Sequence, residues 1–90
     1  MLAVSYTHQF KKDLKQSVKR GRKIPKLNEI VTLLQNERQL SERNRNHKLS
    51  GDYDGHWECH IEPDWLLIYK KNNKAGELIL VRTGTHADLF

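Results

Sequence analysis

Three histidines and one aspartate are the side chains of this sequence best suited to move protons. They are His47, His60, Asp64 and His86. Imidazole gives and takes protons near neutral pH, which makes it the usual side chain of general acid–base catalysis. Any one histidine is more often structural than catalytic, so their joint placement is what matters. They are far apart in the chain and can act together only if the fold brings them to the turn at Pro63–Asp64.

The positive charge of the chain is concentrated in one segment. The formal net charge is +5, and residues 11–26 hold eight basic side chains and one acid, whereas residues 51–69 hold five acids and no Lys or Arg. A clustered basic surface is typical of proteins that bind a polyanion, through phosphate contacts and counterion release. A solvated helix face or a site for an acidic protein would show the same pattern; we favour nucleic acid.

The available side chains match the chemistry of RNA cleavage. RNA carries its own nucleophile, the ribose 2′-OH. Its cleavage needs a base for that hydroxyl, an acid for the leaving 5′-oxygen and cationic stabilisation of the phosphorane. Two or three histidines, one carboxylate and one arginine supply these groups without a cofactor.

We expect neither a metal ion nor another cofactor. His56 and His60 would lie roughly 13 Å apart on a strand and could not share one ion. No Cys or His pair has metal-ligand spacing. Convergence of His47, His60 and His86 would be the remaining way to bind an ion.

Length and composition indicate one small globular domain, residues 1–90, with a modest core. No apolar run reaches about 18 residues. The first residues lack the pattern of a signal peptide, and the single Cys59 cannot form an internal disulfide. We therefore expect a cytoplasmic protein without a membrane anchor, in which Cys59 is a small buried side chain rather than a nucleophile.

The N-terminal half predicts a short strand and two helices. Residues 2–6 alternate as in a strand, and Thr7 is a plausible N-cap. The first helix would carry an apolar stripe of Phe10, Leu14 and Val18 and end at Gly21. The second would begin near Pro25, followed by an apolar stripe at 27, 30, 31 and 34. We expect an antiparallel helix hairpin with one shared apolar face.

The C-terminal half predicts a three-stranded meander. The strands cover residues 56–62, 65–71 and 78–83, and the middle one is apolar on both faces, as in a central strand. Residues 41–55 are expected to form connections, and residues 84–90 a short tail that could form one helical turn. The expected order is β-α-α-β-β-β. This is an α+β fold with the helix hairpin on one face of a four-stranded, mainly antiparallel sheet.

Side-chain alternation assigns the strand residues to two faces. Trp57 and Ile61 should face the helices, which leaves Glu58, His60 and Glu62 on an open face. A small domain that leaves a sheet face open usually uses it.

The third strand can contribute to the same face. If Ile79 and Val81 pack inward, Arg82 joins the open face. His86, four residues later, can then fold back over the sheet.

Three motifs of the C-terminal half together resemble those of the YafQ branch of the RelE/ParE toxin superfamily. They are His47-x-Leu49-x-Gly51, His60-x-x-Pro63-Asp64-Trp65 and Arg82-x-Gly84-x-His86-x-x-Leu89-Phe90. The match is close over this half and follows the whole chain in element order and length. It implies the RelE-like form of the fold expected above.

The resemblance implies a bacterial type II toxin. Such a toxin cuts messenger RNA in the ribosomal A site by 2′-OH attack, leaves a 2′,3′-cyclic phosphate and so inhibits translation. The resemblance implies the ribosome, the mRNA and a cognate, DNA-binding antitoxin as partners. The positive charge of this chain favours an acidic antitoxin.

The resemblance also implies His47, His60, Asp64 and His86 as the acid–base set. Our hypothesis makes His86 the general acid, lets Asp64 and His60 orient or deprotonate the 2′-OH, and lets His47 hold the phosphate or share the base role.

Other residues would position the RNA. Trp65 and Phe90 match positions linked to activity, and Arg82 matches a basic residue suited to the scissile phosphate; we add Lys48. The basic segment would dock on ribosomal RNA through Lys11, Lys12, Lys15, Lys19, Arg20, Arg22 and Lys23.

One residue departs from the family pattern. Trp57 stands where we expect many relatives to carry a basic residue. Either one phosphate contact is lost or the indole packs on the helices, and His56 and Tyr53 become candidate substitutes on the RNA side.

Two other functions stay open. A ParE-like toxin would inhibit DNA gyrase by binding, but such toxins are not expected to carry the histidine and aspartate set. A regulatory module would act as a co-repressor only together with an antitoxin. Fold alone cannot decide among these functions, whereas mRNA cleavage that requires ribosomes would.

Overall fold

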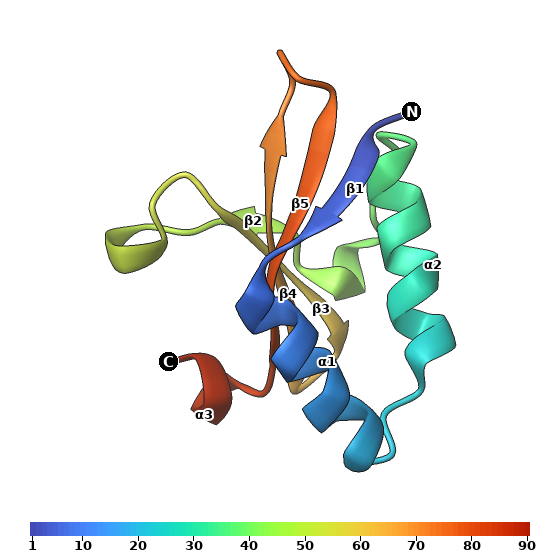
Figure 1. Cartoon of the computed structure of the whole chain (residues 1–90), viewed down its shortest axis with the longest axis vertical. Helices are drawn as coiled ribbons and strands as arrows, with labels where there is room; N and C mark the ends of the chain where they lie inside the picture. The colour runs from blue at the N-terminus through green and yellow to red at the C-terminus, as the bar shows by residue number, and fades with distance from the viewer.

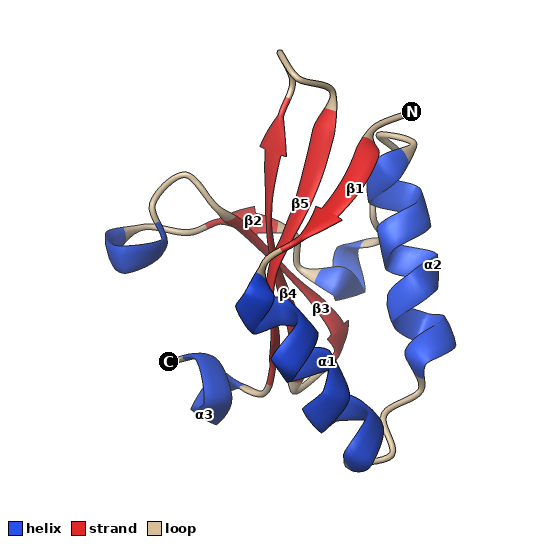
Figure 2. Cartoon of the chain, viewed as in Figure 1, coloured by secondary structure: helices blue, strands red, loops and turns tan.

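The computed structural model describes all 90 residues, as five strands, three α-helices and two 3-10 helices (Figures 1 and 2). The strands are β1 (Ala3–Tyr6), β2 (His47–Lys48), β3 (Trp57–Glu62), β4 (Trp65–Asn72) and β5 (Glu77–Gly84). The helices are α1 (His8–Lys19), α2 (Ile24–Gln35), α3 (His86–Leu89) and the 3-10 helices η1 (Glu42–Asn44) and η2 (Gly51–Tyr53). None of the helices has the length and apolar content that crossing a bilayer requires.

The strands form one sheet in the order β1-β5-β4-β3-β2. β1 pairs with β5 in parallel, and every other pair is antiparallel. The predicted α+β class and element order are therefore confirmed. The sheet has one strand more than predicted, because His47 and Lys48 pair with Glu58 and Trp57 of β3. A strand of two residues carries too little alternation to be seen in a sequence.

Both helices begin as predicted, but α1 buries a different face. Thr7 accepts the N-cap hydrogen bond from the backbone N–H of Phe10, and Pro25 lies in the first turn of α2. The buried residues of α1 are Phe10, Asp13 and Ser17. Val18, predicted to lie on the apolar stripe, is 57% exposed. The helix is rotated toward its polar side because Asp13 is bound by β5.

The main core lies between the sheet and the helix pair, which runs in opposite directions along one side of the sheet (Figure 1). Phe10 of α1 and Leu27 and Leu34 of α2 pack there with Trp65 and other side chains of the sheet. Cys59 is buried in this core, and burial raises the pKa of its thiol to about 12. A thiol that stays protonated at neutral pH is a poor nucleophile, which agrees with the predicted packing role.

The opposite face of the sheet is less open than predicted. Leu66 and Ile68 of β4 are buried there against Leu89 of α3, with Tyr53 of η2 packed against them. β4 is thus buried on both faces, as its apolar sequence indicates. The short helices η2 and α3 cover this face, and their side chains lie at one end of the sheet.

Two β-bulges change which way the later strand residues point. In β3, His60 pairs with Leu66 and Glu62 with Trp65, so Ile61 is the extra residue. Glu62 contacts the helix layer instead of the open face, because a bulge resets the alternation. The prediction for Glu62 is therefore wrong.

The second bulge lies at Val81, since Leu80 pairs with Tyr69 and Arg82 pairs with Ile68. Leu78 and Leu80, rather than Ile79 and Val81, pack in the helix-side core, so the premise used to place Arg82 was wrong. β1 ends at Tyr6, beside Leu80. Arg82 therefore lies where the edge of β5 is uncovered, and its side chain can reach α1.

Candidate active site

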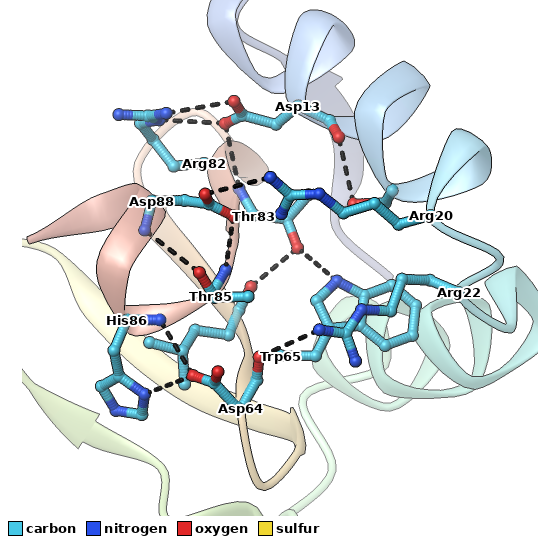
Figure 3. Close-up of polar contacts among 12 residues, drawn as sticks. Asp13, Arg20, Arg22, Asp64, Trp65, Arg82, Thr83, Thr85, His86 and Asp88 are labelled. Carbon is cyan, nitrogen blue, oxygen red and sulfur yellow. Dashed lines mark hydrogen bonds and ion pairs between the residues drawn. The ribbon is translucent and has the colours of Figure 1, made fainter.

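The turn between β3 and β4 meets the start of α3, and this contact forms the centre of the candidate site (Figure 3). Oδ1 of Asp64 accepts a hydrogen bond from the backbone N–H of His86 at 3.0 Å and lies 2.7 Å from Nδ1 of the same residue. The backbone N–H of His86, and then its ring, hold the pKa of the Asp64 carboxyl below its ordinary value. Since an ionised carboxylate only accepts, Nδ1 carries the proton, and Nε2 is the nitrogen left for proton transfer.

His60 lies beside this pair. Its ring centroid is 5.5 Å from that of His86, in an edge-to-face arrangement. Its Nδ1 lies 3.2 Å from the carbonyl oxygen of Pro63, which can only accept, so this nitrogen is the donor. The side chain is 11% exposed, so one edge of the ring remains reachable from solvent.

Glu58 connects His60 to His47. Its Oε1 lies 3.6 Å from Nε2 of His60 and 3.5 Å from Nε2 of His47. The Nδ1 of His47 is 2.6 Å from the carbonyl oxygen of Arg45, so both rings point their Nε2 atoms at one carboxylate. Glu58 is 4% exposed, and its Oε2 has no hydrogen-bond partner. A buried carboxylate is costly without partners, and the imidazoles of His47 and His60 are the side chains that face this one.

The structure thus brings together all four predicted acid–base residues, from β2, β3, the β3–β4 turn and α3. Sequence reasoning missed Glu58 as a member of the site. The available signal was its position two residues from His60, on the same strand face. A hollow of about 570 Å³ lies against His60, between α2 and the chain around η1, and Arg43 lines it.

Trp65, predicted to stack on or position the RNA, has no side-chain surface that a base could contact directly. It is 0% exposed, in the core between sheet and helices. Its indole N–H donates to Oγ1 of Thr83 at 3.0 Å, and the Thr83 hydroxyl donates in turn to the carbonyl oxygen of Leu66 at 2.7 Å. A fully buried indole has no face to offer a base, so Trp65 supports the turn from beneath.

Arg82 is bound by an acid that the sequence pattern did not single out. Its Nε and Nη2 donate to the two carboxylate oxygens of Asp13 at 2.9 and 3.1 Å (Figure 3). Asp13 also accepts from the backbone N–H of Thr83 at 3.2 Å. These hydrogen bonds raise the pKa of Arg82. Asp13 uses two of the five N–H donors of the guanidinium, so the assignment of Arg82 to the scissile phosphate stays a prediction.

Three further residues lie where substrate could reach them: Phe90, Lys48 and Trp57. Phe90 is 64% exposed and makes an edge-to-face contact with Tyr53 at 5.8 Å. The Nζ of Lys48 lies 5.5 Å from the ring centroid of Trp57. Trp57 packs against the helix-side core, which is the second of the two possibilities raised by its departure from the family pattern. Tyr53 also contacts His56 at 5.8 Å, so an aromatic cluster borders the site.

The predicted basic surface divides into free and paired side chains. Lys26 and Arg22 contact the carboxylate of Glu62 at 2.9 and 3.4 Å, and Arg20 binds Asp88. The rest of the basic segment is exposed and has no ion-pair partner: Lys11, Lys12, Lys15, Lys19 and Lys23. These five lysines remain the candidate polyanion surface.

The fold and the site together define a small basic α+β domain with an acid–base constellation at one end of its sheet. Comparison with known proteins identifies the family to which such a domain belongs. The family model described as bacterial toxin of type II toxin–antitoxin system, YafQ, matches residues 2–90. The mRNA interferase toxin YafQ of Escherichia coli K12 is 42% identical over 88 residues, covering 97% of this chain and 94% of that protein. The chain belongs to the YafQ family of bacterial type II toxins.

Two solved structures are similar over their whole length. YafQ in the E. coli DinJ–YafQ toxin–antitoxin complex has a TM-score of 0.88 and 41% identity, covering 99% of this chain and 97% of that one. A metal-bound toxin from Helicobacter pylori has a TM-score of 0.94 and 38% identity, covering both chains fully. In the present chain no group of three or more His, Cys, Asp and Glu side chains is arranged to hold a metal ion.

Proposed function

We propose that this protein is an mRNA interferase, an endoribonuclease that cuts mRNA on the ribosome without a metal ion. The observation that carries the proposal is the Asp64–His86 pair with the ring of His60 beside it at 5.5 Å. This is the geometry of two proton-transfer groups, one of them oriented by a carboxylate. The E. coli relative at 42% identity bears the name of the same activity.

In the proposed reaction, His60 takes the proton of the 2′-OH while O2′ attacks the adjacent phosphorus. The P–O5′ bond breaks, and Nε2 of His86 gives its proton to the leaving 5′-oxygen. The products are a 2′,3′-cyclic phosphate and a free 5′-hydroxyl. Asp64 holds the imidazolium of His86, a narrower role than the base function considered from the sequence. Positive charge for the phosphorane would come from His47 and from the N–H groups of Arg82 that Asp13 leaves free.

The partners we propose are the ribosome and an acidic antitoxin. The five free lysines lie along α1 and the segment after it, outside the acid–base site. Phosphate contacts by such a surface would dock the toxin on ribosomal RNA. The same surface attracts an acidic protein, and a relative has been solved in complex with the antitoxin DinJ.

The test compares wild type with His86→Ala in a translation extract and on the same mRNA without ribosomes. We expect wild type to cut mRNA only when ribosomes are present. His86→Ala should lose about 10²-fold or more in rate, the usual contribution of a general acid, while it still folds and binds antitoxin. Comparable cutting of naked RNA would show a free ribonuclease instead. No cutting under either condition would favour a toxin that acts by binding.

A further inference from the structure

The short segment between α1 and α2 contacts both chain segments that meet at the Asp64–His86 pair. Arg20 reaches α3, and Arg22 reaches the β3–β4 turn (Figure 3). Sequence reasoning placed both arginines on the ribosome-docking surface. Their contacts are instead made within this chain, with the two segments that carry Asp64 and His86.

Arg20 binds α3 through a two-pronged ion pair. Its Nη1 and Nη2 donate to the two carboxylate oxygens of Asp88 at 2.5 and 3.3 Å. The guanidinium of Arg20, followed by the backbone N–H of Thr85, holds the pKa of Asp88 far below its usual range. Single surface ion pairs are weak, but a fork-to-fork pair also fixes orientation.

Asp88 in turn fixes the start of α3. Its carboxylate accepts from the backbone N–H of Thr85 at 2.9 Å, and its own N–H donates to Oγ1 of Thr85 at 3.1 Å, which forms a capping box. A helix of four residues is not stable without such support. The fit is close, because a Cβ on Gly84 would lie 3.0 Å from Cβ of Asp88. His86 lies within this turn, so its position depends on the turn being held.

Arg22 holds the other half of the site. Its Nη2 donates to the backbone carbonyl of Asp64 at 3.4 Å, and its Nη1 lies 3.4 Å from the carboxylate of Glu62. Its guanidinium carbon lies 5.7 Å from the ring centroid of Trp65. The turn that presents Asp64 is therefore bound to the same segment as α3.

We propose that Arg20 and Arg22 are positioning residues for the Asp64–His86 pair, Arg20 acting through Asp88 and Arg22 through the backbone of Asp64. This inference rests on the proposed mRNA cleavage for its kinetic consequences. A displacement of about 1 Å between reacting groups can cost about 10²-fold in rate. Loss of the tether should therefore lower kcat, whereas loss of a ribosome-docking contact should raise KM.

The experiment compares Arg20→Ala with Lys70→Ala, which removes the same charge from an exposed residue of β4. Both are measured for kcat and KM in the ribosome-containing cleavage assay. We expect Arg20→Ala to lower kcat roughly tenfold or more, with little change in KM, and Lys70→Ala to behave as wild type. Arg20→Lys keeps the charge but loses the fork, so its kcat should fall between those of wild type and Arg20→Ala. A raised KM with unchanged kcat would overturn the proposal and support docking.

A second readout does not depend on catalysis. Carbon NMR titration of the Asp64 carboxyl reports its contact with His86, because that contact lowers the pKa of Asp64. In Arg20→Ala the pKa should rise toward its ordinary value, and in Lys70→Ala it should not change. Equal values in the two variants would overturn the tether even if wild type cleaves no RNA. Inactive wild-type protein with the expected shift would instead refute only the proposed function.

Asp88→Asn separates the two contacts of Asp88. The amide oxygen can still cap Thr85, but the charge that binds Arg20 is lost. We expect its kcat to fall as in Arg20→Ala, and the double variant to be no worse than either single one. Additive losses would contradict action through one shared contact.

Discussion

Asp64 accepts two hydrogen bonds at one oxygen, from the backbone and from the ring of His86, a residue 22 positions later in the chain. The backbone contact fixes where α3 starts, and the ring contact fixes which nitrogen faces the substrate. One carboxylate therefore sets both the position and the tautomer of the proposed general acid.

Replacing Asp64 with Asn should affect catalysis far more than folding. The amide removes the negative charge that stabilises a protonated His86, and it no longer selects the tautomer. Because Asp64 is exposed, we expect little change in melting temperature. The rate should fall about 10²-fold or more, as when an orienting carboxylate is lost. Cleavage in the ribosome-containing assay and thermal unfolding measure the two effects, and an unchanged kcat would contradict the role given to Asp64.

The Asp64–His86 contact also predicts a direction of pH dependence. The pKa of Asp64 is lowered from its ordinary value of 3.8. A carboxyl with a lowered pKa contributes stability above its unfolded pKa and loses it as pH falls through its folded pKa. The pair should therefore stay intact from neutral pH down to about pH 4. Carbon NMR titration should place the Asp64 midpoint below 3.8, and His86→Ala, which keeps the backbone donor, should raise it only part of the way.

Glu58→Gln should separate stability from activity. Glu58 is buried with one carboxylate oxygen unpaired, so removing its charge should leave the free energy of unfolding unchanged or raise it by about 1 kcal/mol. Cleavage should fall roughly tenfold, because His47 and His60 lose the carboxylate that both rings face. The control is Glu29→Gln, on the exposed side of α2, which should change neither quantity. A large loss of stability in Glu58→Gln would show that the carboxylate is structural.

Trp65→Phe should destabilise the fold without removing an RNA contact. The change deletes the indole N–H that donates to Thr83 and leaves a small void in the core. We expect a loss of about 1–3 kcal/mol in the free energy of unfolding. The kcat and KM of the folded protein should stay within about twofold of wild type. A raised KM in a fully folded variant would restore the substrate contact that burial argues against.

Phe90→Ala should show the opposite pattern. Phe90 is mostly exposed and contacts Tyr53, so its loss should change stability by no more than about 0.5 kcal/mol. If its ring stacks on a base, KM should rise about tenfold, since stacking contributes about 1–3 kcal/mol per base. Cleavage at several mRNA concentrations measures this, and an unchanged KM would remove Phe90 from the RNA contact.

Local sequence patterns determined most of the fold. Thr7 and Pro25 mark the helix starts through their own backbone chemistry. The apolar run in β4 predicted a strand buried on both faces, and alternation in β3 placed Trp57 and His60 on opposite sides. These properties depend on the residues themselves and on the period of the element, so no knowledge of distant segments was needed.

Part of the candidate site was also accessible from the sequence. Because imidazole chemistry and a turn at Pro63–Asp64 narrow the choice, His47, His60, Asp64 and His86 could be proposed together. The structure supplied the contacts among them and added Glu58, whose importance depends on burial between two rings.

The tertiary structure alone decided the partners of the charged side chains. Arg82 and Asp13 are 69 residues apart, and Arg20 and Asp88 are 68 apart, so no periodicity relates them. The bulge at Ile61 reversed the expected direction of Glu62, and Leu78 and Leu80 pack inward where Ile79 and Val81 were expected to. Trp65 directly follows the turn that carries Asp64, yet it is buried because the helices cover its side of the sheet. Such outcomes depend on which segments pack together. That packing is set by the whole chain, so no local sequence pattern predicts it.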